Sequence, residues 1–290
     1  MNINWYPGHM KKTKELLKEQ LKLVDVVWEL LDARIPRSSK NPDIDPIVHG
    51  KPKIVILNKK DLADPRVTED WVRYFKEQGI TAIPMNSIDS SSASQLLNES
   101  KNLLEEKLAA RRAKGIRREV IRAMIVGIPN VGKSSMINKY AKKKSAKTGN
   151  KPGVTKGKQW VRIQKDLEML DTPGILWPRL DDKKAALNLA FVGTIKDEIM
   201  DRETLGLRLV ETLLRNYPKD LFDRYGLEDM DEETTALEVL DTIAKKRGCM
   251  FKGNEVDYLR VANVLLDEFR SGMIAKISLE TPRDQSTWEK

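Results

Sequence analysis

The sequence predicts an α/β domain, a mostly parallel sheet with helices on both faces, followed by an all-helical domain. Two observations predict this fold. Short apolar runs typical of buried parallel strands alternate with amphipathic helical stretches up to Pro178. Beyond that residue the strand pattern stops and only helical patterns continue. We therefore expect one domain over residues 1–178 and a second over 179–290, and 290 residues suffice for both to bury a core.

Each predicted element is recognised by the spacing of its apolar residues. Short apolar runs predict strands at 24–31, 53–57, 80–85, 121–127, 159–163 and 167–170. Apolar residues repeating at helical spacing predict helices between them at 10–21, 67–78, 93–112 and 133–141. In the second domain the same spacing predicts helices at 185–199, 205–217, 234–247 and 256–270.

The composition is that of an ordinary soluble protein, with 40% hydrophobic and 33% charged residues. The single cysteine, Cys249, excludes an intramolecular disulfide and is expected as a small buried residue. Residues 1–12 lack the apolar core of a secretory signal, so we expect a cytoplasmic protein. No apolar run approaches the roughly 20 residues that span a bilayer, and a membrane role has no support in the sequence.

The formal net charge of +9 is carried by the first domain. Residues 1–178 hold 34 basic and 20 acidic side chains, whereas 179–290 hold 18 and 23. The stretch 139–165 contains ten basic residues and no acidic one. Such a block indicates either a polyanion partner or a solvated loop. We favour the polyanion, because the block lies between two phosphate-binding motifs.

The sequence Gly127-Ile-Pro-Asn-Val-Gly-Lys-Ser134 matches the phosphate-binding loop G-x-x-x-x-G-K-S. It follows a predicted strand and opens a predicted helix, which is the context that the motif requires. Backbone N–H groups of such a loop surround the phosphates of a nucleotide. Lys133 is expected to reach the β- and γ-phosphates, and Ser134 to bind Mg²⁺. The residues expected to contact the nucleotide here are Asn130, Val131, Gly132, Lys133, Ser134 and Ser135.

A second motif, Asn58-Lys-Lys-Asp61, ends the second predicted strand, at the edge where open α/β sheets bind ligands. Asp61 can accept hydrogen bonds from N1–H and the exocyclic amine of guanine, whereas adenine offers neither donor. A desolvated carboxylate facing adenine would stay unpaired, at a cost of about 1 to 3 kcal/mol. Asn58 is expected to hold the loop and reach N7, and the stem of Lys59 to pack on the base. After the next strand, Asn86 and Ser87 are placed for a backbone N–H to meet guanine O6.

A third motif, Asp171-Thr-Pro-Gly174, ends the last predicted strand. Asp171 is expected to hold Mg²⁺ through water, and the Gly174 N–H to meet the γ-phosphate. Thr155 can bind Mg²⁺ only while a γ-phosphate is present, which makes 145–158 a predicted order–disorder switch. Together the motifs predict an enzyme that binds GTP and hydrolyses it to GDP and phosphate.

The motifs occur in a permuted order. In the usual order the phosphate loop comes first and the base-reading motif last, but here 58–61 precedes 127–134 and 171–174. The sequence thus predicts a circularly permuted P-loop GTPase domain. Permutation makes the segment after Gly174 the end of that domain, so the helical domain must anchor it. We therefore expect a change at the γ-phosphate to alter the orientation of the helical domain.

Rejoining the chain in the usual order places the N-terminal segment just after the third motif, close to the γ-phosphate. Most GTPases carry a water-orienting Gln at this point, but here the residue after the motif is Ile175. His9 is the best candidate to replace the Gln, and the alternative is that His9 caps a turn or contacts RNA. The catalytic residues expected are therefore His9, Lys133, Thr155 and Gly174.

These residues resemble the circularly permuted GTPases of the YlqF/YawG type. The resemblance rests on Trp5-Tyr-Pro-Gly-His-Met10, Asp32-Ala-Arg-Ile-Pro36 and the three motifs above. It covers the whole first domain and, more loosely, the helical domain. It implies a bacterial assembly factor for the large (50S) ribosomal subunit, with a helical C-terminal domain that binds rRNA. It also implies GTP hydrolysis stimulated by the ribosomal particle, with His9 in catalysis.

Asn130 is similar to the Asn that marks potassium-stimulated GTPases, in which K⁺ bridges the phosphates much as an arginine finger would. The alternative is a loop side chain bonded to its own backbone. The net charge of −5 over 179–290 departs from what an RNA-binding domain suggests, and it favours the switch region and the N-terminal segment as RNA-binding parts. Trp160 and Trp177 flank the switch region, and we expect them in the core rather than stacked on RNA bases.

The sequence leaves two functions open. The favoured one is a GTP-hydrolysing assembly factor for the large ribosomal subunit, a monomer that binds rRNA according to its nucleotide. The alternative is a GTP-gated module that binds RNA or protein outside the ribosome, with incidental hydrolysis. The cofactors expected are GTP or GDP, Mg²⁺ and, from the resemblance at Asn130, K⁺.

Overall fold

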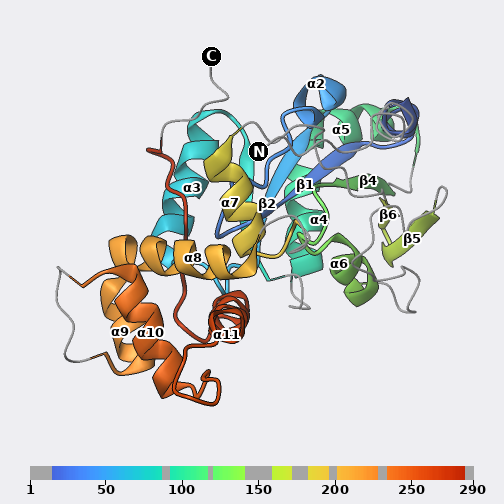
Figure 1. The fold of residues 1–290 in the computed structure, drawn as a ribbon. Coiled ribbons are helices and arrows are strands. Elements are labelled where there is room, and N and C mark those ends of the chain that lie inside the picture. The colour runs from blue at the N-terminus through green and yellow to red at the C-terminus, as the bar shows by residue number, and fades with distance from the viewer. Residues whose placement is uncertain are drawn as a thin grey trace.

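The computed structural model describes residues 15–86, 92–116, 120–140, 159–171, 182–195, 201–227 and 234–284. In this part of the chain, six strands form one sheet in the order β3-β2-β1-β4-β6-β5 (Figure 1). Neighbouring strands are parallel, except that β5 runs antiparallel to β6. The prediction of a mostly parallel sheet is confirmed. The strands are β1 (Val26–Asp32), β2 (Lys53–Asn58), β3 (Thr81–Met85), β4 (Ile121–Val126), β5 (Gln159–Gln164) and β6 (Leu167–Asp171).

The predicted strands are all found within two residues of their expected bounds. β1 is central, with β2 on one side and β4 on the other, and every one of its residues is buried. A strand covered on both faces needs apolar residues at successive positions, which explains the continuous apolar run that predicted it.

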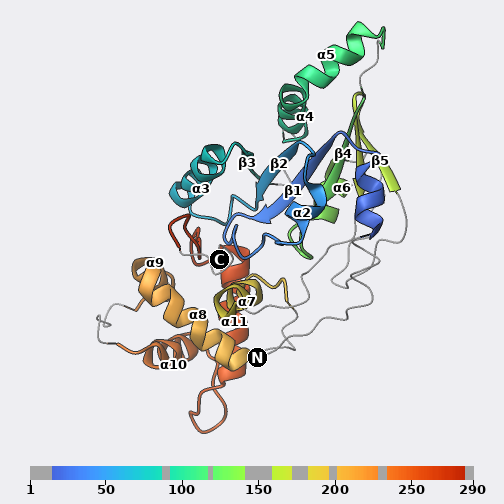
Figure 2. The same cartoon turned by 90° about the horizontal axis from the view of Figure 1, so that it is seen from above.

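Helices cover both faces of the sheet, as predicted (Figure 2). On one face, residues 15–21, which are helical, and two further helices pack on side chains such as Val27 and Val55. On the other face, three helices pack on the alternate side chains of the same strands, and the Trp28 Nε1–H donates to Ser100 Oγ at 3.1 Å. In chain order these helices are α2 (Ile44–Val48), α3 (Pro65–Glu77), α4 (Ser92–Leu103), α5 (Glu105–Ala113) and α6 (Lys133–Tyr140).

The predicted helix 93–112 is wrong in one respect, because the chain turns at Leu104 and forms α4 and α5 instead. Leu104 and Leu108 are both buried against the sheet, at 2% and 1% exposure. Since apolar residues keep helical spacing on both sides of the turn, their periodicity alone does not reveal it.

The helical part gathers on one side of the sheet domain (Figures 1 and 2). Helices α8 and α11 pack closely, because Gly206 lies where a Cβ would come within 2.5 Å of the Ala262 Cβ. Cys249 is buried, as predicted. Among the described residues, no helix combines the length and apolar character needed to cross a bilayer. The helices are α7 (Lys183–Phe191), α8 (Arg202–Asn216), α9 (Pro218–Tyr225), α10 (Ala236–Lys246) and α11 (Tyr258–Ser271).

Two helices of this part differ from the prediction. α7 was expected to continue to 199 but ends at Phe191, because the chain turns at Gly193 with φ +74°. α9 was not predicted, since it begins at Pro218 directly after α8 and ends at Gly226, which adopts the left-handed conformation.

Trp160 was expected in the core, and this prediction is wrong. It lies on β5, at the edge of the sheet, and 37% of its surface is exposed. Its ring packs beneath the guanidinium group of Arg122, 5.2 Å from the ring centroid, rather than beneath a helix. Trp177 lies outside the described residues.

After α11 the chain returns to the sheet domain as an extended stretch, residues 275–284, which we call the C-terminal segment (Figure 1). The Ile277 N–H donates to Leu62 O at 2.9 Å, and the Leu279 N–H donates to Arg34 O at 2.8 Å. The predicted boundary near residue 178 lies outside the described residues and stays a prediction. The end of the second predicted domain thus lies against the first one.

Candidate nucleotide-binding site

The loops after β1, β2 and β4 meet at one edge of the sheet. These strands are parallel neighbours, with Asp32 of β1 opposite Asn58 of β2 and Glu29 opposite Val126 of β4. Their carboxyl ends therefore lie together, which is where open α/β sheets bind ligands. The base-reading motif follows β2 and the phosphate loop follows β4, so the two motifs flank the end of β1.

The phosphate loop has a backbone that requires glycine at its first position. Gly127 has φ +150°, and a Cβ there would lie 2.6 Å from Leu30 O on β1. Asn130 and Gly132 also have positive φ, at +59° and +108°. Strand β4, the loop and helix α6 follow one another as the motif predicts, with Lys133 as the first residue of the helix.

Lys133 crosses its own loop. The side chain is buried, and its Nζ donates to Gly127 O at 2.9 Å and to Ile128 O at 2.6 Å. Ser134 is partly buried and Ser135 is exposed. The ammonium group is thus held among backbone oxygens at the start of α6, where a helix N-terminus favours anions.

A hydrogen bond joins the base-reading motif to the phosphate loop. Asn58 is buried, and its Nδ2 donates to Val131 O at 2.7 Å. The Asn58 carbonyl accepts from Ala33 N–H at 2.8 Å, and Lys60 N–H donates to Met85 O at 3.1 Å. These bonds hold the loop among the ends of the three strands and the phosphate loop. Asp61 in this loop is exposed, and Asn86, which follows β3, is partly buried.

Asp32, at the end of β1, holds two cations. Its carboxylate accepts from Arg34 Nε at 3.0 Å and Nη2 at 2.9 Å, and it pairs with Lys59 Nζ at 2.9 Å. Burial alone would raise the pKa of Asp32, but the charges of Arg34 and Lys59 outweigh it and hold that pKa well below its usual range. Lys59 itself has φ +61°. The ion pair therefore fixes a strained residue of the base-reading motif.

In the sequence, Asp32 and Arg34 stand out only through the family resemblance, and no role was predicted for either residue. The available signal was position, since Asp32 ends the strand that lies between the two motif-bearing strands. Its partner Lys59 could not be read from spacing, because Asp32 ends β1 whereas Lys59 lies in the loop after β2.

Helix α11 is linked to both motif loops through intermediate residues. On the base-reading side, the Arg34 guanidinium lies over the Phe269 ring, 5.6 Å from its centroid. On the phosphate side, Asn130 Nδ2 donates to Gly193 O at 3.0 Å, in the turn after α7. Arg270 holds that turn, with Nε donating to Phe191 O at 2.9 Å and Nη2 to Ala190 O at 2.9 Å.

The C-terminal segment binds the loop after β1 through a buried carboxylate, Glu280. It accepts from Ser38 N–H at 3.0 Å, from Arg37 N–H at 2.8 Å and from Asn188 Nδ2 at 3.0 Å. Burial raises the pKa of Glu280, and these hydrogen bonds act in the opposite direction. Sequence reasoning missed Glu280, because nothing in its local pattern points to partners more than 200 residues away.

Five predicted site residues cannot be placed with their side chains. His9, Ser87, Thr155 and Gly174 lie outside the described residues, and so does the predicted switch 145–158. Asp171 is the last residue of β6, beside β4 and at the same edge of the sheet, but its side chain is not described. The roles expected for these residues stay predictions.

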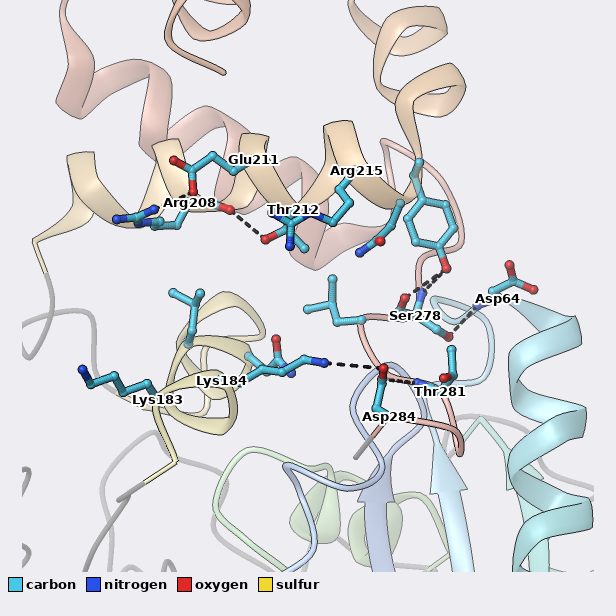
Figure 3. A pocket seen from close by; sticks show the side chains of 15 residues that line it. Asp64, Lys183, Lys184, Arg208, Glu211, Thr212, Arg215, Ser278, Thr281 and Asp284 are labelled. Atoms are coloured by element: carbon cyan, nitrogen blue, oxygen red, sulfur yellow. Dashed lines mark hydrogen bonds and ion pairs between the residues drawn. The ribbon is translucent and has the colours of Figure 1, made fainter. Parts of the chain in front are cut away.

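A separate cavity of about 1050 Å³ lies between α7, α8 and the C-terminal segment (Figure 3). The charges of its described lining residues are nearly balanced, with four cations and three carboxylates. Lys184 pairs with Asp284 at 3.6 Å and Arg208 with Glu211 at 2.8 Å (Figure 3). Of the predicted site residues that the structure describes, none lines it.

Comparison with known proteins identifies the chain's relatives. A family model described as 50S ribosome-binding GTPase matches residues 122–241. The match starts within β4 and includes the phosphate loop, whereas the base-reading motif precedes it, as the permuted order requires.

Curated relatives match over nearly their whole length. Ribosome biogenesis GTPase A of Priestia megaterium is 47% identical, over 98% of this chain and 98% of that protein. The proteins of the same name from Bacillus licheniformis and Thermotoga maritima are 47% and 33% identical, over 98% and 97% of this chain and 100% and 95% of theirs.

Two solved structures have the same fold. GNP-bound YlqF from T. maritima is 29% identical, with a TM-score of 0.67, over 94% of this chain and 100% of that one. The GDP-bound form of TM YlqF gives a TM-score of 0.66 at 29% identity, over 93% and 100%. The chain therefore belongs to the ribosome biogenesis GTPase A family, and it is an enzyme that binds guanine nucleotide and hydrolyses GTP.

Proposed function

We propose that this GTPase assists assembly of the large ribosomal subunit in the cytoplasm, binding rRNA as a monomer and according to its nucleotide. The observation that carries the nucleotide part is the 2.7 Å hydrogen bond from Asn58 to Val131, which joins the base-reading and phosphate loops in one site. The ribosomal part is supported by relatives named ribosome biogenesis GTPase A that match this chain from end to end.

At the base, Asp61 accepts from N1–H and the exocyclic amine of guanine, and the stem of Lys59 packs on the ring. The exposure of Asp61 in the loop and the ion pair between Lys59 and Asp32 support this arrangement. A backbone N–H at Asn86-Ser87 meets guanine O6, supported by the bond from Lys60 N–H to Met85 O, which draws the end of β3 to the loop.

At the phosphates, Lys133 exchanges its bonds to Gly127 O and Ile128 O for oxygens of the β- and γ-phosphates. Ser134, Thr155 and Asp171 supply hydroxyl and carboxylate oxygens, the donors that Mg²⁺ prefers. Ser134 at the start of α6 and Asp171 at the end of the adjacent strand fit this role by position. Mg²⁺ bound there neutralises charge on the phosphates.

Asn130 is the proposed ligand of K⁺. Its amide nitrogen donates to Gly193 O, which fixes the side chain and leaves its amide oxygen as the atom suited to a cation. GTPase rates compared in KCl and NaCl at equal ionic strength test this role. Equal rates in the two salts would contradict it.

His9 is the proposed catalytic residue, orienting the attacking water together with the Gly174 N–H and Thr155. His9→Ala should preserve affinity for a GTP analogue and depress turnover by about 10² or more, the range of a positioned acid–base group. His49→Ala is the matched control, because His49 is exposed at the end of α2. Unchanged turnover in the His9 variant would move the catalytic assignment elsewhere.

Co-sedimentation with large-subunit precursors tests the ribosomal role directly. The GTP-analogue form should pellet with precursors and the GDP form should not, and large subunits should accelerate hydrolysis, by up to about 10³ to 10⁵ if partner groups complete the site. Equal pelleting of both forms, with no acceleration, would favour a GTP-gated module acting outside the ribosome.

A further inference from the structure

A second cavity, of about 490 Å³, opens at the amino ends of the strands, opposite the carboxyl ends that carry the nucleotide site. Its lining comes from the residues before β1, β2 and β4 and from α5, so it lies at the amino ends of the strands. Helix α5 lies on the side of the sheet away from α7–α11 (Figure 2). The charged lining residues are Lys22, Lys51, Lys107, Arg111, Arg122 and Asp25.

Among the described lining residues, Asp25 is the one carboxylate, and it is used within the protein. Asp25 is buried and accepts from Lys107 Nζ at 2.7 Å, Arg111 Nη2 at 2.7 Å and Arg122 N–H at 3.1 Å. Burial opposes ionisation, but the hydrogen bonds from Lys107, Arg122 and Arg111 hold the pKa of Asp25 below its usual value. Two of the five described cations, Lys107 and Arg111, pair with Asp25, and the lining as a whole keeps a net positive charge.

The cations also repel one another. Lys51 Nζ donates to Val24 O at 2.9 Å, and burial together with the charge of Lys107 lowers the pKa of Lys51. An anion placed between them would relieve this repulsion. The cavity of Figure 3 differs in charge, because its described lining has four cations and three carboxylates. Two of these cations, Lys184 and Arg208, already form ion pairs with carboxylates of the same lining.

Arg122 connects the cavity to an exposed aromatic ring. Its guanidinium lies 5.2 Å from the ring centroid of Trp160, and its Nε is 3.4 Å from Glu168. Trp160 keeps 37% of its surface exposed on the edge strand. Cations beside an exposed indole are typical of surfaces that bind single-stranded nucleic acid, because cations bind its phosphates and aromatic rings stack on its bases.

We propose that Lys22, Lys51, Lys107, Arg111, Arg122 and Trp160, here called the basic edge, bind a single-stranded RNA segment. Phosphates occupy the cavity, and a base stacks at Trp160. The proposal rests on the rRNA binding proposed above and adds a second contact surface to it. Because the cavity lies at the amino ends of the strands, away from the motif loops, the affinity of its cations for RNA is independent of the bound nucleotide.

The test compares two charge reversals of equal size. The basic-edge variant is Lys22→Glu with Arg122→Glu, and the control is Arg66→Glu with Lys76→Glu, two exposed residues of α3. The probe is a fluorescently labelled uridine 20-mer, titrated by anisotropy at several salt concentrations with GDP or a GTP analogue. Far-UV circular dichroism and basal GTPase activity confirm that both variants fold.

The basic-edge variant should lose at least tenfold in RNA affinity in both nucleotide states. Its slope of log affinity against log salt should fall by roughly 1.4, since each phosphate contact to a single strand contributes about 0.7. The control should keep the wild-type slope. Equal affinity of the two variants, or a loss confined to one nucleotide state, would overturn the proposal.

Substitutions of Trp160 separate the contribution of base stacking to RNA affinity from that of charge. Trp160→Ala should lower RNA affinity at least about fivefold and Trp160→Phe much less, because base–aromatic stacking is what the ring supplies. Neither change should alter binding of inorganic polyphosphate, which has no bases. If polyglutamate competes as well as RNA of equal charge, the surface takes an acidic protein instead and the proposal fails.

Failure of this inference can be told apart from failure of the proposed function. If large subunits stimulate the wild type and the basic-edge variant equally, with unchanged RNA affinity, only the basic edge is contradicted. If they do not stimulate the wild type, the ribosomal role fails, while the anisotropy comparison still decides the basic edge.

Discussion

The two ends of the nucleotide site are held in different ways. The base-reading loop is held from outside, by the buried carboxylate of Asp32, by Val131 of the phosphate loop and by the C-terminal segment at Leu62. The phosphate loop is held mainly from within, by Lys133 on its own carbonyls, with one outside bond from Asn130 to Gly193.

This difference suggests a separate role for each loop in recognising the nucleotide. A loop fixed by buried ion pairs keeps its shape whichever nucleotide is bound, which suits a site that selects guanine. A loop whose lysine bonds its own backbone can exchange those bonds for phosphates, which suits a site that distinguishes GTP from GDP. Phe269 and Arg270 are consecutive in α11, so one helix contacts the supports of both loops.

The largest effect is expected at the phosphate end. Lys133→Ala should lower GDP affinity at least a hundredfold, because hydrogen bonds to charged groups contribute about 1.5 to 3 kcal/mol each and Lys133 makes two or more. Isothermal titration calorimetry measures it, with Lys139→Ala as control, an exposed lysine on the same helix. Affinity within threefold of wild type would remove Lys133 from the site.

Breaking the base-reading support should destabilise the fold. Asp32→Asn leaves Arg34 and Lys59 without their carboxylate, which should lower the free energy of unfolding by about 3 to 5 kcal/mol in urea titrations. The control Asp70→Asn removes an exposed ion pair to Arg73 and should cost about 1 kcal/mol or less.

The loss of stability caused by Asp32→Asn should also depend on pH. Because folding lowers the pKa of Asp32, its ionised form stabilises the protein above the unfolded pKa of about 3.9. That contribution is lost as pH falls below 3.9 towards the folded pKa. The gap between wild type and Asp32→Asn should therefore narrow in acid, and a constant gap from pH 7 to pH 3 would refute the assignment.

Asp61→Asn tests recognition of the base, and because Asp61 is exposed we expect little effect on the stability of the fold. Asp61→Asn should weaken GDP binding about tenfold to a hundredfold, since an unpaired donor at the base costs about 1 to 3 kcal/mol. Xanthosine diphosphate, which presents an acceptor where guanine has its amine, should bind the variant better than the wild type. Calorimetry with both nucleotides provides the internal control, and parallel losses for both would contradict base reading by Asp61.

The smallest effect is expected from the helical side. Arg270→Met removes the bonds that hold the turn at Gly193 and should weaken GTP-analogue binding by about 0.5 to 2 kcal/mol, the range of changes that act through a neighbour. The preference for guanine over xanthine should not change, because the bonds from Arg270 to Phe191 O and Ala190 O act on the phosphate side of the site. Arg260→Met, exposed on the same helix, is the control.

Much of the fold followed from local sequence. The six strands were predicted because strands buried on both faces need consecutive apolar residues, and the phosphate loop because its motif follows a strand and opens a helix. The structure adds that Gly127 approaches Leu30 O within a distance that a Cβ forbids. The turn at Leu104 was not predicted, because apolar residues keep helical spacing on both sides of it. Helix α9 was not predicted, because it is short and begins at Pro218, directly after the longer helix α8.

By itself, the sequence determined the permuted order of the motifs and the strands that carry them, and it predicts which residues meet each end of the nucleotide. Only the tertiary structure decided what supports them: Asp32 with Lys59, Asn130 with Gly193, and Glu280 with Ser38. The physical reason is that strand and helix patterns arise from neighbours a few residues apart. Partners separated by 27, 63 or 242 residues meet only once the sheet and the helical part have packed.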